Sequence, residues 1–463
     1  MSELVGDLKK VDMRVWTAVF VVFSFVCSGG FGIEDMVSGS GPGFALLLLL
    51  ILPFVWGLPQ ALVCSELGAA LPEDGGLYRW SRRANGEFMG FQTGWWWVLS
   101  IFVDSAGYIA LTVDYSKTWF HLTGLERWIL AVVLIAIFAY INIRGLQLAA
   151  WLLVAFQIVV LIPFTALAVI GIANWHHNPF HPILLSGNSL VGGVGLALSV
   201  GIWMYSGFES LSTMAGEMKD PGRVIPKALM ITLPIVIAFY VGSTMGGLAM
   251  VGRFNQWSTS GPLDFMGVGR VAGGQILRYL FFAAMLCGNF ALFLAFLAAG
   301  ARPSFVMSRD KLLPKFLGKT HKKYGTPFLA ILLMAGVDAI LVQWGFSKLI
   351  VIDVFLLMLA HITIYISAVR LRVKEPDLPR PFKVKLPTWG FAAMCAVPIA
   401  VALLAVSPWG NGWDSFKIGA IAALSGTPAY FIFRKIYGGR RALEAEGLED
   451  GAVEAVAGPA AED

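Results

Sequence analysis

Runs of apolar residues, separated by short charged or Pro/Gly-rich stretches, follow one another along most of the chain. Many of these runs reach ~20 residues, the length that an α-helix needs to cross a bilayer. The pattern therefore predicts an all-α membrane protein with twelve transmembrane helices. The predicted spans lie near 15–38, 42–70, 89–118, 126–143, 147–174, 192–217, 226–251, 273–301, 327–344, 347–369, 388–407 and 416–435.

Composition argues against a water-soluble enzyme. Hydrophobic residues make up 57% of the 463 positions and charged residues only 14%, whereas soluble proteins carry about 25% charged residues. The four cysteines stand far apart inside apolar runs, which indicates neither a zinc site nor a disulfide framework. The spans leave no room for a large soluble domain, and we expect no cleavable signal at the N-terminus.

Basic residues favour one side of the predicted bundle. If successive helices alternate in direction, most of the 34 lysines and arginines fall in the N-terminus, the loops after even-numbered spans and the C-terminal tail. Because basic loops stay in the cytoplasm, both termini are expected there. Residues 1–14 then form a cytoplasmic N-terminus, and 436–463 form an acidic, disordered cytoplasmic tail. The net charge of +5 follows from this topology and gives no indication of nucleic acid.

Glycines interrupt the first and sixth predicted spans. The stretch 28–32 divides span 1, and Ser206 with Gly207 divides span 6. Unwound backbone at membrane depth is tolerated only where it lines a cavity or is buried in protein. These spans are the first members of two five-helix halves that cross in opposite directions, which indicates an inverted repeat with a binding site at its midplane. The alternative is that the glycines serve only close helix packing.

Several motifs resemble those of the amino acid/polyamine/organocation permeases, most closely the polyamine-uptake branch of that superfamily. The resemblance extends over about residues 15 to 435, with the motifs in the same order and spacing as in the family. The segments that carry it are 28–35, 71–80, 104–115, 205–209, 215–221, 308–314 and 324–327.

The resemblance implies a secondary transporter with a five-plus-five inverted repeat of the kind shared by this superfamily. Substrate would lie between the discontinuous helices 1 and 6, with spans 3, 8 and 10 closing the site. Many relatives couple transport through a lysine in span 5 or a sodium site; here 149–164 contains no lysine, and Gln157 and Val160 are the positions to examine. We expect no cofactor, and a proton as the coupling ion. The implied units are 15–174 for the first repeat, 192–369 for the second and 388–435 for two further helices.

Three acidic residues beside the breaks favour a positively charged substrate. Glu34 and Asp35 lie in the first turn after the first break, where they complement the positive end of the half-helix and oppose a substrate carboxylate. Glu209 follows the second break directly. Such a cluster suits the ammonium groups of a polyamine or a cationic amino acid. For Asp35 the alternative is an exposed capping carboxylate at the outer mouth.

Aromatic residues near these acids offer further contacts for an ammonium group. Asp104 and Tyr108 are four positions apart and share one helix face. Tyr205 and Phe208 flank the second break, where ring faces attract cations. Ordinary packing is the alternative for both pairs. The predicted substrate-binding residues are Ser28, Gly29, Gly30, Gly32, Glu34, Asp104, Tyr108, Tyr205, Ser206, Gly207, Phe208 and Glu209.

Other polar residues are better explained by structural roles. Asn289 in span 8 suits an interhelical hydrogen bond. His176, His177 and His181 lie in a Pro-rich stretch without a neighbouring acid, so we predict no metal site.

Together these features predict a secondary active transporter, and not an enzyme, that imports amino acids or polyamines across the cytoplasmic membrane. Proton or other cation symport with alternating access is the expected mechanism. The alternative is an exchanger, which needs the same substrate site but no ion site. A nutrient sensor would be expected to carry a larger cytoplasmic domain. The expected partners are a small-molecule amine and the lipid bilayer.

Overall fold

The chain is built from helices in the computed structural model, as the apolar pattern predicts. The structure describes residues 8, 10–116, 123–185, 192–258, 263–344, 346–407 and 413–439. Within these ranges the β contacts are two isolated bridges, Val11 with Met218 and Trp257 with Leu263.

The helices are given in chain order. The first part of the chain forms α1 (Val15–Val26), α2 (Ile33–Ser40), α3 (Pro42–Leu52), η1 (Pro53–Gly57), α4 (Leu58–Ala70), α5 (Leu77–Asn85), α6 (Glu87–Ser116), α7 (Gly124–Arg144) and α8 (Leu146–Ala173). The second part forms α9 (Gly192–Met204), η2 (Ser210–Glu217), α10 (Pro221–Val251), η3 (Phe254–Gln256), α11 (Phe265–Arg309), η4 (Lys315–Gly318), α12 (Phe328–Leu341), η5 (Val342–Trp344) and α13 (Phe346–Lys374). The last part forms α14 (Thr388–Val406), α16 (Trp413–Leu424) and α17 (Gly426–Tyr437).

Nine helices in the described part of the chain are long and apolar enough to cross a membrane. One of them, Pro42–Ala70, joins α3, η1 and α4 and coincides with the predicted span 42–70. It remains continuous because the π turn η1 accommodates Pro53, which has no amide hydrogen to donate. The protein is therefore an integral, multi-pass membrane protein.

Two predicted helices differ from the observed ones. α11 starts at Phe265, before the expected start of span 8 at 273, but non-helical angles at Gly273 and Gly274 interrupt it, so its long second segment begins close to the expected position. Gly274 has a φ of 69°, which glycine adopts without strain, and the pair forms a kink between the two helical segments. After the break in span 6, the chain continues as the short 3₁₀ helix η2 and not as an α-helix.

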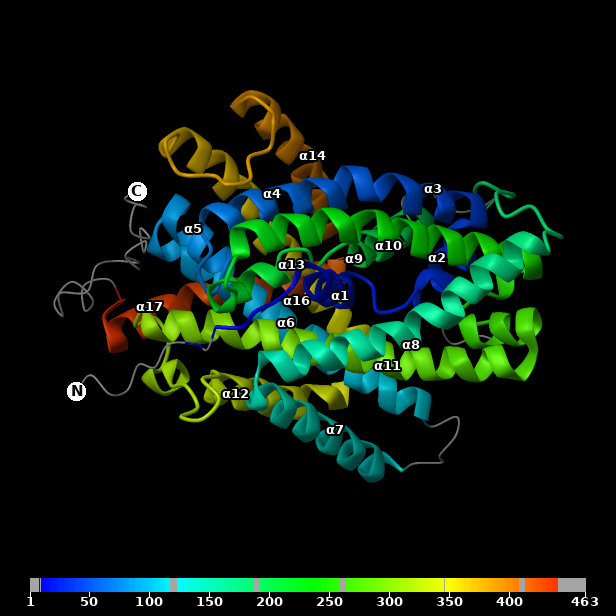
Figure 1. The fold of residues 1–463 in the computed structure, drawn as a ribbon, viewed down its shortest axis with the longest axis horizontal. Coiled ribbons are helices and arrows are strands. Elements are labelled where there is room, and N and C mark those ends of the chain that lie inside the picture. Colours follow the sequence, from blue (N-terminus) through cyan, green and yellow to red (C-terminus); the bar gives the residue numbers. More distant parts are fainter. Residues whose placement is uncertain are drawn as a thin grey trace, which may run out of the picture.

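Most helices run along the long axis of the molecule, with α1 near the centre (Figure 1). α8 and α6 both pack against α11, α13 packs against α6, and α10 packs against α8. α14 and α16 lie against α13, and α17 lies against α6. This arrangement encloses both helix breaks.

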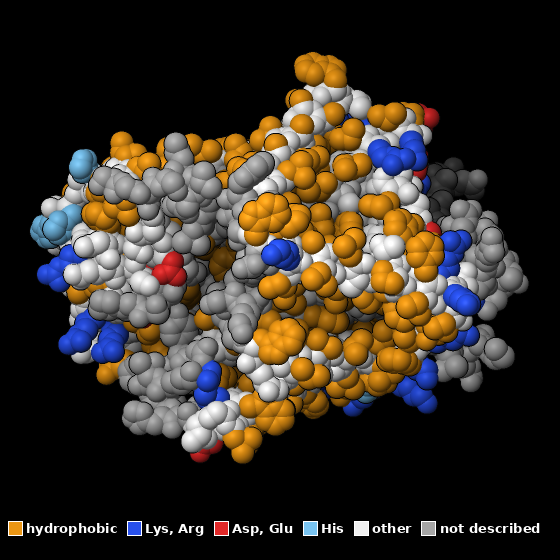
Figure 2. Space-filling model, turned by 180° about the vertical axis from the view of Figure 1, so that it is seen from behind, with side chains coloured by type: hydrophobic (Ala, Val, Ile, Leu, Met, Phe, Trp, Pro, Cys, Tyr) orange, Lys and Arg blue, Asp and Glu red, His pale blue; other side chains and the backbone are white. Residues whose placement is uncertain are grey.

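The surface is that of a protein solvated by lipid along its middle. Figure 2 shows hydrophobic side chains over the central part of one face and basic side chains gathered toward its ends. Exposed large apolar residues occur on many helices, among them Trp151, Val169, Ile276, Ile340 and Ile421. Contiguous apolar surface of this extent is buried in a bilayer rather than left in water.

Candidate functional site

The second helix break contacts the last turn of α1, directly before the first break. The chain unwinds between α1 and α2 and again between α9 and η2. Gly29 and Gly32 in the first break have φ values of 121° and 103°, and Gly207 in the second has 109°. A Cβ atom on Gly207 would lie 2.7 Å from the carbonyl oxygen of Phe25. Conformation and contact therefore both require glycine at 207.

Helices α8 and α11 fix the first break. The Ser28 hydroxyl donates to the carbonyl oxygen of Ser24 and accepts from Gln157 Nε2, both at 2.9 Å. On α11, a Cβ at Gly288 would lie 2.0 Å from the Ser28 carbonyl oxygen, so the two backbones touch. Gln157, where a coupling group was sought, thus serves to hold Ser28.

Glu34 is buried and braces two helix N-termini. Its Oε2 accepts from the backbone N–H of Gly32 at 2.8 Å, and its Oε1 accepts from the backbone N–H of Phe265 at 3.1 Å. Both oxygens therefore already bind donors of the protein, which places Glu34 at the start of α2 and α11 as a cap. The neighbouring Asp35 accepts from the Ser258 hydroxyl at 2.9 Å.

Glu209, directly after the second break, is buried among side chains from three helices. It accepts from Gln60 Nε2 on α4 at 2.9 Å and from Trp97 Nε1 on α6 at 3.2 Å. His361 on α13 places its Nε2 3.2 Å from Glu209 Oε2. Sequence analysis did not identify His361 or Gln60 as neighbours of this carboxylate.

Asp104 on α6 keeps one carboxylate oxygen available. Its Oδ2 accepts from the Tyr108 hydroxyl at 3.0 Å, while Oδ1 has no hydrogen-bond partner within the described ranges. The Tyr108 ring stacks between Trp203 and Phe296, with centroid distances of 6.4 and 6.1 Å. The predicted pair on one helix face is therefore an acceptor beside aromatic walls.

A second buried acid, Asp353 on α13, was not predicted. Ser100 on α6 donates to its Oδ1, and its Oδ2 is without a partner in the described part of the chain. Asp353 lies close enough to Asp104 and Glu209 to interact electrostatically with both carboxylates. The sequence does carry a signal for Asp353, which is an acid inside the apolar run 347–369. Carboxylates within a membrane span are energetically costly and usually serve a function.

Two predicted residues around the second break, Tyr205 and Ser206, make hydrogen bonds that fix it. The Tyr205 hydroxyl donates to the carbonyl oxygen of Leu49 at 2.8 Å. The Ser206 hydroxyl donates to the backbone of Ile202 and accepts from Trp56 Nε1 at 3.0 Å. Phe208 is fully buried.

The predicted residues thus fall into two groups. Those that shape or brace the breaks are Ser28, Gly29, Gly30, Gly32, Glu34, Tyr205, Ser206, Gly207 and Phe208. Those that present acidic or aromatic groups between helices are Asp104, Tyr108 and Glu209, to which the structure adds Asp353 and His361.

Comparison with known proteins gives the family. A family model described as amino acid permease matches residues 13–423. The chain belongs to this family. One relative, a probable polyamine transporter of Arabidopsis thaliana, is 32% identical over 422 residues, which cover 90% of this chain and 81% of the relative. The polyamine transporter PUT1 of Oryza sativa subsp. japonica is 31% identical over 390 residues, which cover 83% of this chain and 71% of the relative. The resemblance carried by the motifs is confirmed.

In this amino acid permease, two of the family-like motifs meet at one end of the bundle. Asp310, at the end of α11, accepts from the Tyr78 hydroxyl at 2.5 Å and from Arg79 Nη1 at 2.8 Å, and it also pairs with Arg82. Residues distant in sequence thereby tie α5 to α11. A second ion pair joins α4 to α13, where Glu66 pairs with Arg372 at 2.5 Å.

The loop between α4 and α5 of the permease adds a titrating carboxyl to this end. Burial raises the pKa of Asp74 to about 7. The charge of Glu217 contributes to this rise in the pKa, while Arg302, which is paired with Glu217, acts against it. A group with this pKa changes charge close to neutral pH.

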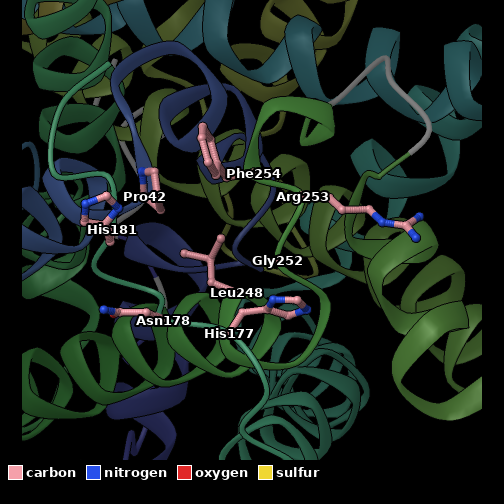
Figure 3. Close-up of a pocket in the computed structure, with 8 residues that line it drawn as sticks. All are labelled: Pro42, His177, Asn178, His181, Leu248, Gly252, Arg253 and Phe254. Atoms are coloured by element: carbon pink, nitrogen blue, oxygen red, sulfur yellow. The ribbon is translucent and has the colours of Figure 1, made fainter. Parts of the chain in front are cut away.

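A separate cavity of about 350 Å³ lies at the opposite end of the permease, where α10 ends. His177 and His181 line it together with Arg253, as Figure 3 shows. Within the described ranges, no group of three or more His, Cys, Asp or Glu side chains is placed to hold a metal ion. None of the predicted substrate-binding residues lines this cavity.

Proposed function

We propose that this permease imports polyamines, with amino acids as the alternative substrate class, and that protons drive the import. The observation that carries the choice is the cap on α2. The start of a half-helix is the natural site for a substrate carboxylate, because its N–H groups point outward and its dipole is positive there. Here Glu34 occupies the Gly32 N–H and opposes a second carboxylate. A substrate without a carboxylate fits this site better than a zwitterion.

Carboxylates between the helices supply the matching negative charge. Asp104 and Asp353 are both buried, and each has one oxygen without a partner among the described residues. Two such oxygens suit two ammonium groups of one molecule. The named relatives that are polyamine transporters support the same substrate class.

Charge balance supports a proton as the co-transported ion. Three buried carboxylates surround this region, namely Asp104, Asp353 and Glu209. Two ammonium groups and one proton neutralise them, which removes most of the cost of carrying charge through a low-dielectric interior. The protein then changes between outward-open and inward-open states with its site filled.

The proposed architecture follows the predicted one. It has twelve spans, with repeats at 15–174 and 192–369 and two further helices in 388–435. The contact between the second break and the end of α1 supports this, because each break lies in the first helix of its half. We place both termini in the cytoplasm, on the charge distribution of the loops.

A binding experiment tests the substrate class. Thermal unfolding of the purified protein would be measured with 1,4-diaminobutane, 1-aminobutane and neutral amino acids. A ligand at 100 times its dissociation constant stabilises by about 2.7 kcal/mol. We expect the diamine to raise Tm and the monoamine, which lacks the second ammonium group, to raise it much less. Stabilisation by neutral amino acids but not by the diamine would contradict the proposal.

A further inference from the structure

One contact in the Glu209 site leaves a position for a single proton. Gln60 Nε2 lies 2.9 Å from Glu209 Oε2 and 2.5 Å from His361 Nε2. An amide nitrogen is only a donor, so a ring nitrogen at this distance accepts from it and carries no hydrogen of its own. His361 Nε2 and Glu209 Oε2 therefore face each other at 3.2 Å as two acceptors. One added proton between them turns this contact into a charge-assisted hydrogen bond.

The hydrogen bonds of Gln60 and His361 have to change when this proton binds. Gln60 Oε1 and His361 Nδ1 are buried and have no hydrogen-bond partner in the part of the chain that the structure describes. Once His361 Nε2 carries a hydrogen, it clashes with the Gln60 amide nitrogen. The Gln60 amide nitrogen then moves away from this hydrogen and keeps its donation to Glu209 Oε2, while His361 Nε2 donates to the same carboxylate.

The neighbouring groups favour a proton at this position. Trp97 donates to the other oxygen of Glu209, and the Trp56 ring meets His361 edge-on at 5.4 Å. The titratable groups that face the pair are Cys64 from α4, and Asp353 and Tyr365 from α13. Each of these three is neutral or negative, so none opposes an added positive charge.

We propose that Glu209 and His361 together hold the coupling proton, and that the Gln60 amide nitrogen gives up its contact with His361 when the proton binds. The proton comes from the outer aqueous phase, binds between the two side chains and leaves on the inner side. No other covalent bond forms or breaks. This inference rests on the proposed proton-driven import and assigns its ion site. It leaves Asp104 and Asp353 as the carboxylates for substrate.

Three variants in proteoliposomes test this assignment. His361→Gln retains a side-chain amide that donates to Glu209 but does not titrate. Glu209→Gln removes the charge while keeping the shape. His176→Gln is the matched control, because His176 is exposed on the loop after α8. Each protein is assayed for diamine uptake driven by an imposed pH gradient and for exchange of internal against external diamine.

We expect the first two variants to lose at least tenfold of their gradient-driven uptake while exchange stays within about twofold of wild type, and the control to match wild type in both assays. Gradient-driven uptake at the wild-type level in either variant would overturn the assignment. Loss of exchange along with uptake in both variants would also overturn it, because the pair would then serve substrate binding or folding.

The same assay separates this inference from the proposed function. If the wild-type protein responds to an outward rather than an inward proton gradient, symport is wrong. The two variants then still test whether Glu209 and His361 hold the proton. Their gradient-driven diamine transport is compared with that of wild type, for the direction of the pH gradient that drives the wild-type protein.

Discussion

At the scale of single residues, the site is defined by which carboxylate oxygens remain available. Glu34 was predicted as a substrate contact from its position after the first break, but the structure places both of its oxygens on backbone N–H groups. One of those groups belongs to Phe265, far away in the sequence. No local pattern reveals such a partner, so sequence alone does not separate a cap from a ligand.

Asp353 and His361 are the opposite case, because the structure brings them to the site and the sequence analysis did not name them. Both lie inside the predicted span 347–369, and the resemblance already named span 10 as a wall of the site. Their polarity in an apolar run was a sufficient signal to single them out. Their partners, Ser100 for Asp353 and Glu209 for His361, come from other helices and become known only from the fold.

A substitution at Asp353 tests the second ammonium site. Asp353→Asn removes one charge-assisted hydrogen bond to the substrate, which is worth about 1.5–3 kcal/mol. We expect affinity for 1,4-diaminobutane to fall roughly ten- to a hundredfold, measured by titration of the purified protein. Asp338→Asn is the control, because Asp338 is a buried acid on α12 that accepts from Ser105. Equal losses in both variants would indicate a general effect of removing buried charge.

At the scale of helices, the sequence located the breaks but not all of the boundaries. The three positive-φ glycines at 29, 32 and 207 lie where the glycine pattern indicated interruption. The Gly273–Gly274 pair follows the same pattern and interrupts α11 with a kink two residues long. Glycine content shows where a helix is weak, and packing decides whether it unwinds or bends.

The contact between the second break and the end of α1 predicts a sharp effect of small side chains. Gly207→Ala forces a positive φ on an L-residue and drives a Cβ into the Phe25 carbonyl. We expect transport to be abolished while the protein still inserts into the membrane, as judged by uptake assay and membrane fractionation. Gly336→Ala on α12 is the control, since a Cβ there meets nothing within 4 Å. Near-normal uptake by Gly207→Ala would show that the second break is not held against α1 during transport.

The loop between α4 and α5 predicts a dependence of stability on pH. The pKa of Asp74 rises from 3.8 to about 7 in the folded protein. Between these values the folded protein binds more protons than the unfolded chain, so this contribution to stability is full below about pH 4 and is lost as pH rises to about 7. Asp74→Asn should therefore raise Tm relative to wild type at pH 8 and bring no such gain at pH 4. The same difference at both pH values would exclude titration of Asp74 as the cause.

At the scale of the whole molecule, the distribution of charged and apolar side chains on the surface matches a membrane environment. The proposed orientation places η4 and the ion pairs around Asp310 on the cytoplasmic side, and the cavity beside His177 outside. Composition and loop charge were sufficient for this proposal, because insertion depends on these coarse properties rather than on side-chain packing.

Cysteine labelling tests the orientation. A cysteine at Lys319, after η4, should react with an impermeant reagent only from the cytoplasmic side, and one at Ser258 only from outside. The native Cys27, Cys64 and Cys395 are buried, and the half-buried Cys287 is replaced by serine to keep the background low. Labelling of the two positions from the opposite sides would invert the topology.

The central claim is that the permease accumulates a diamine at the expense of a proton gradient. Uptake of labelled 1,4-diaminobutane into proteoliposomes without internal substrate measures it most directly. We predict accumulation above the external concentration when the outside is acidic, collapse of that accumulation when a protonophore is added, and a matching alkalinisation of the external medium. Uptake that requires internal substrate and ignores the pH gradient would contradict the account and identify the protein as an exchanger.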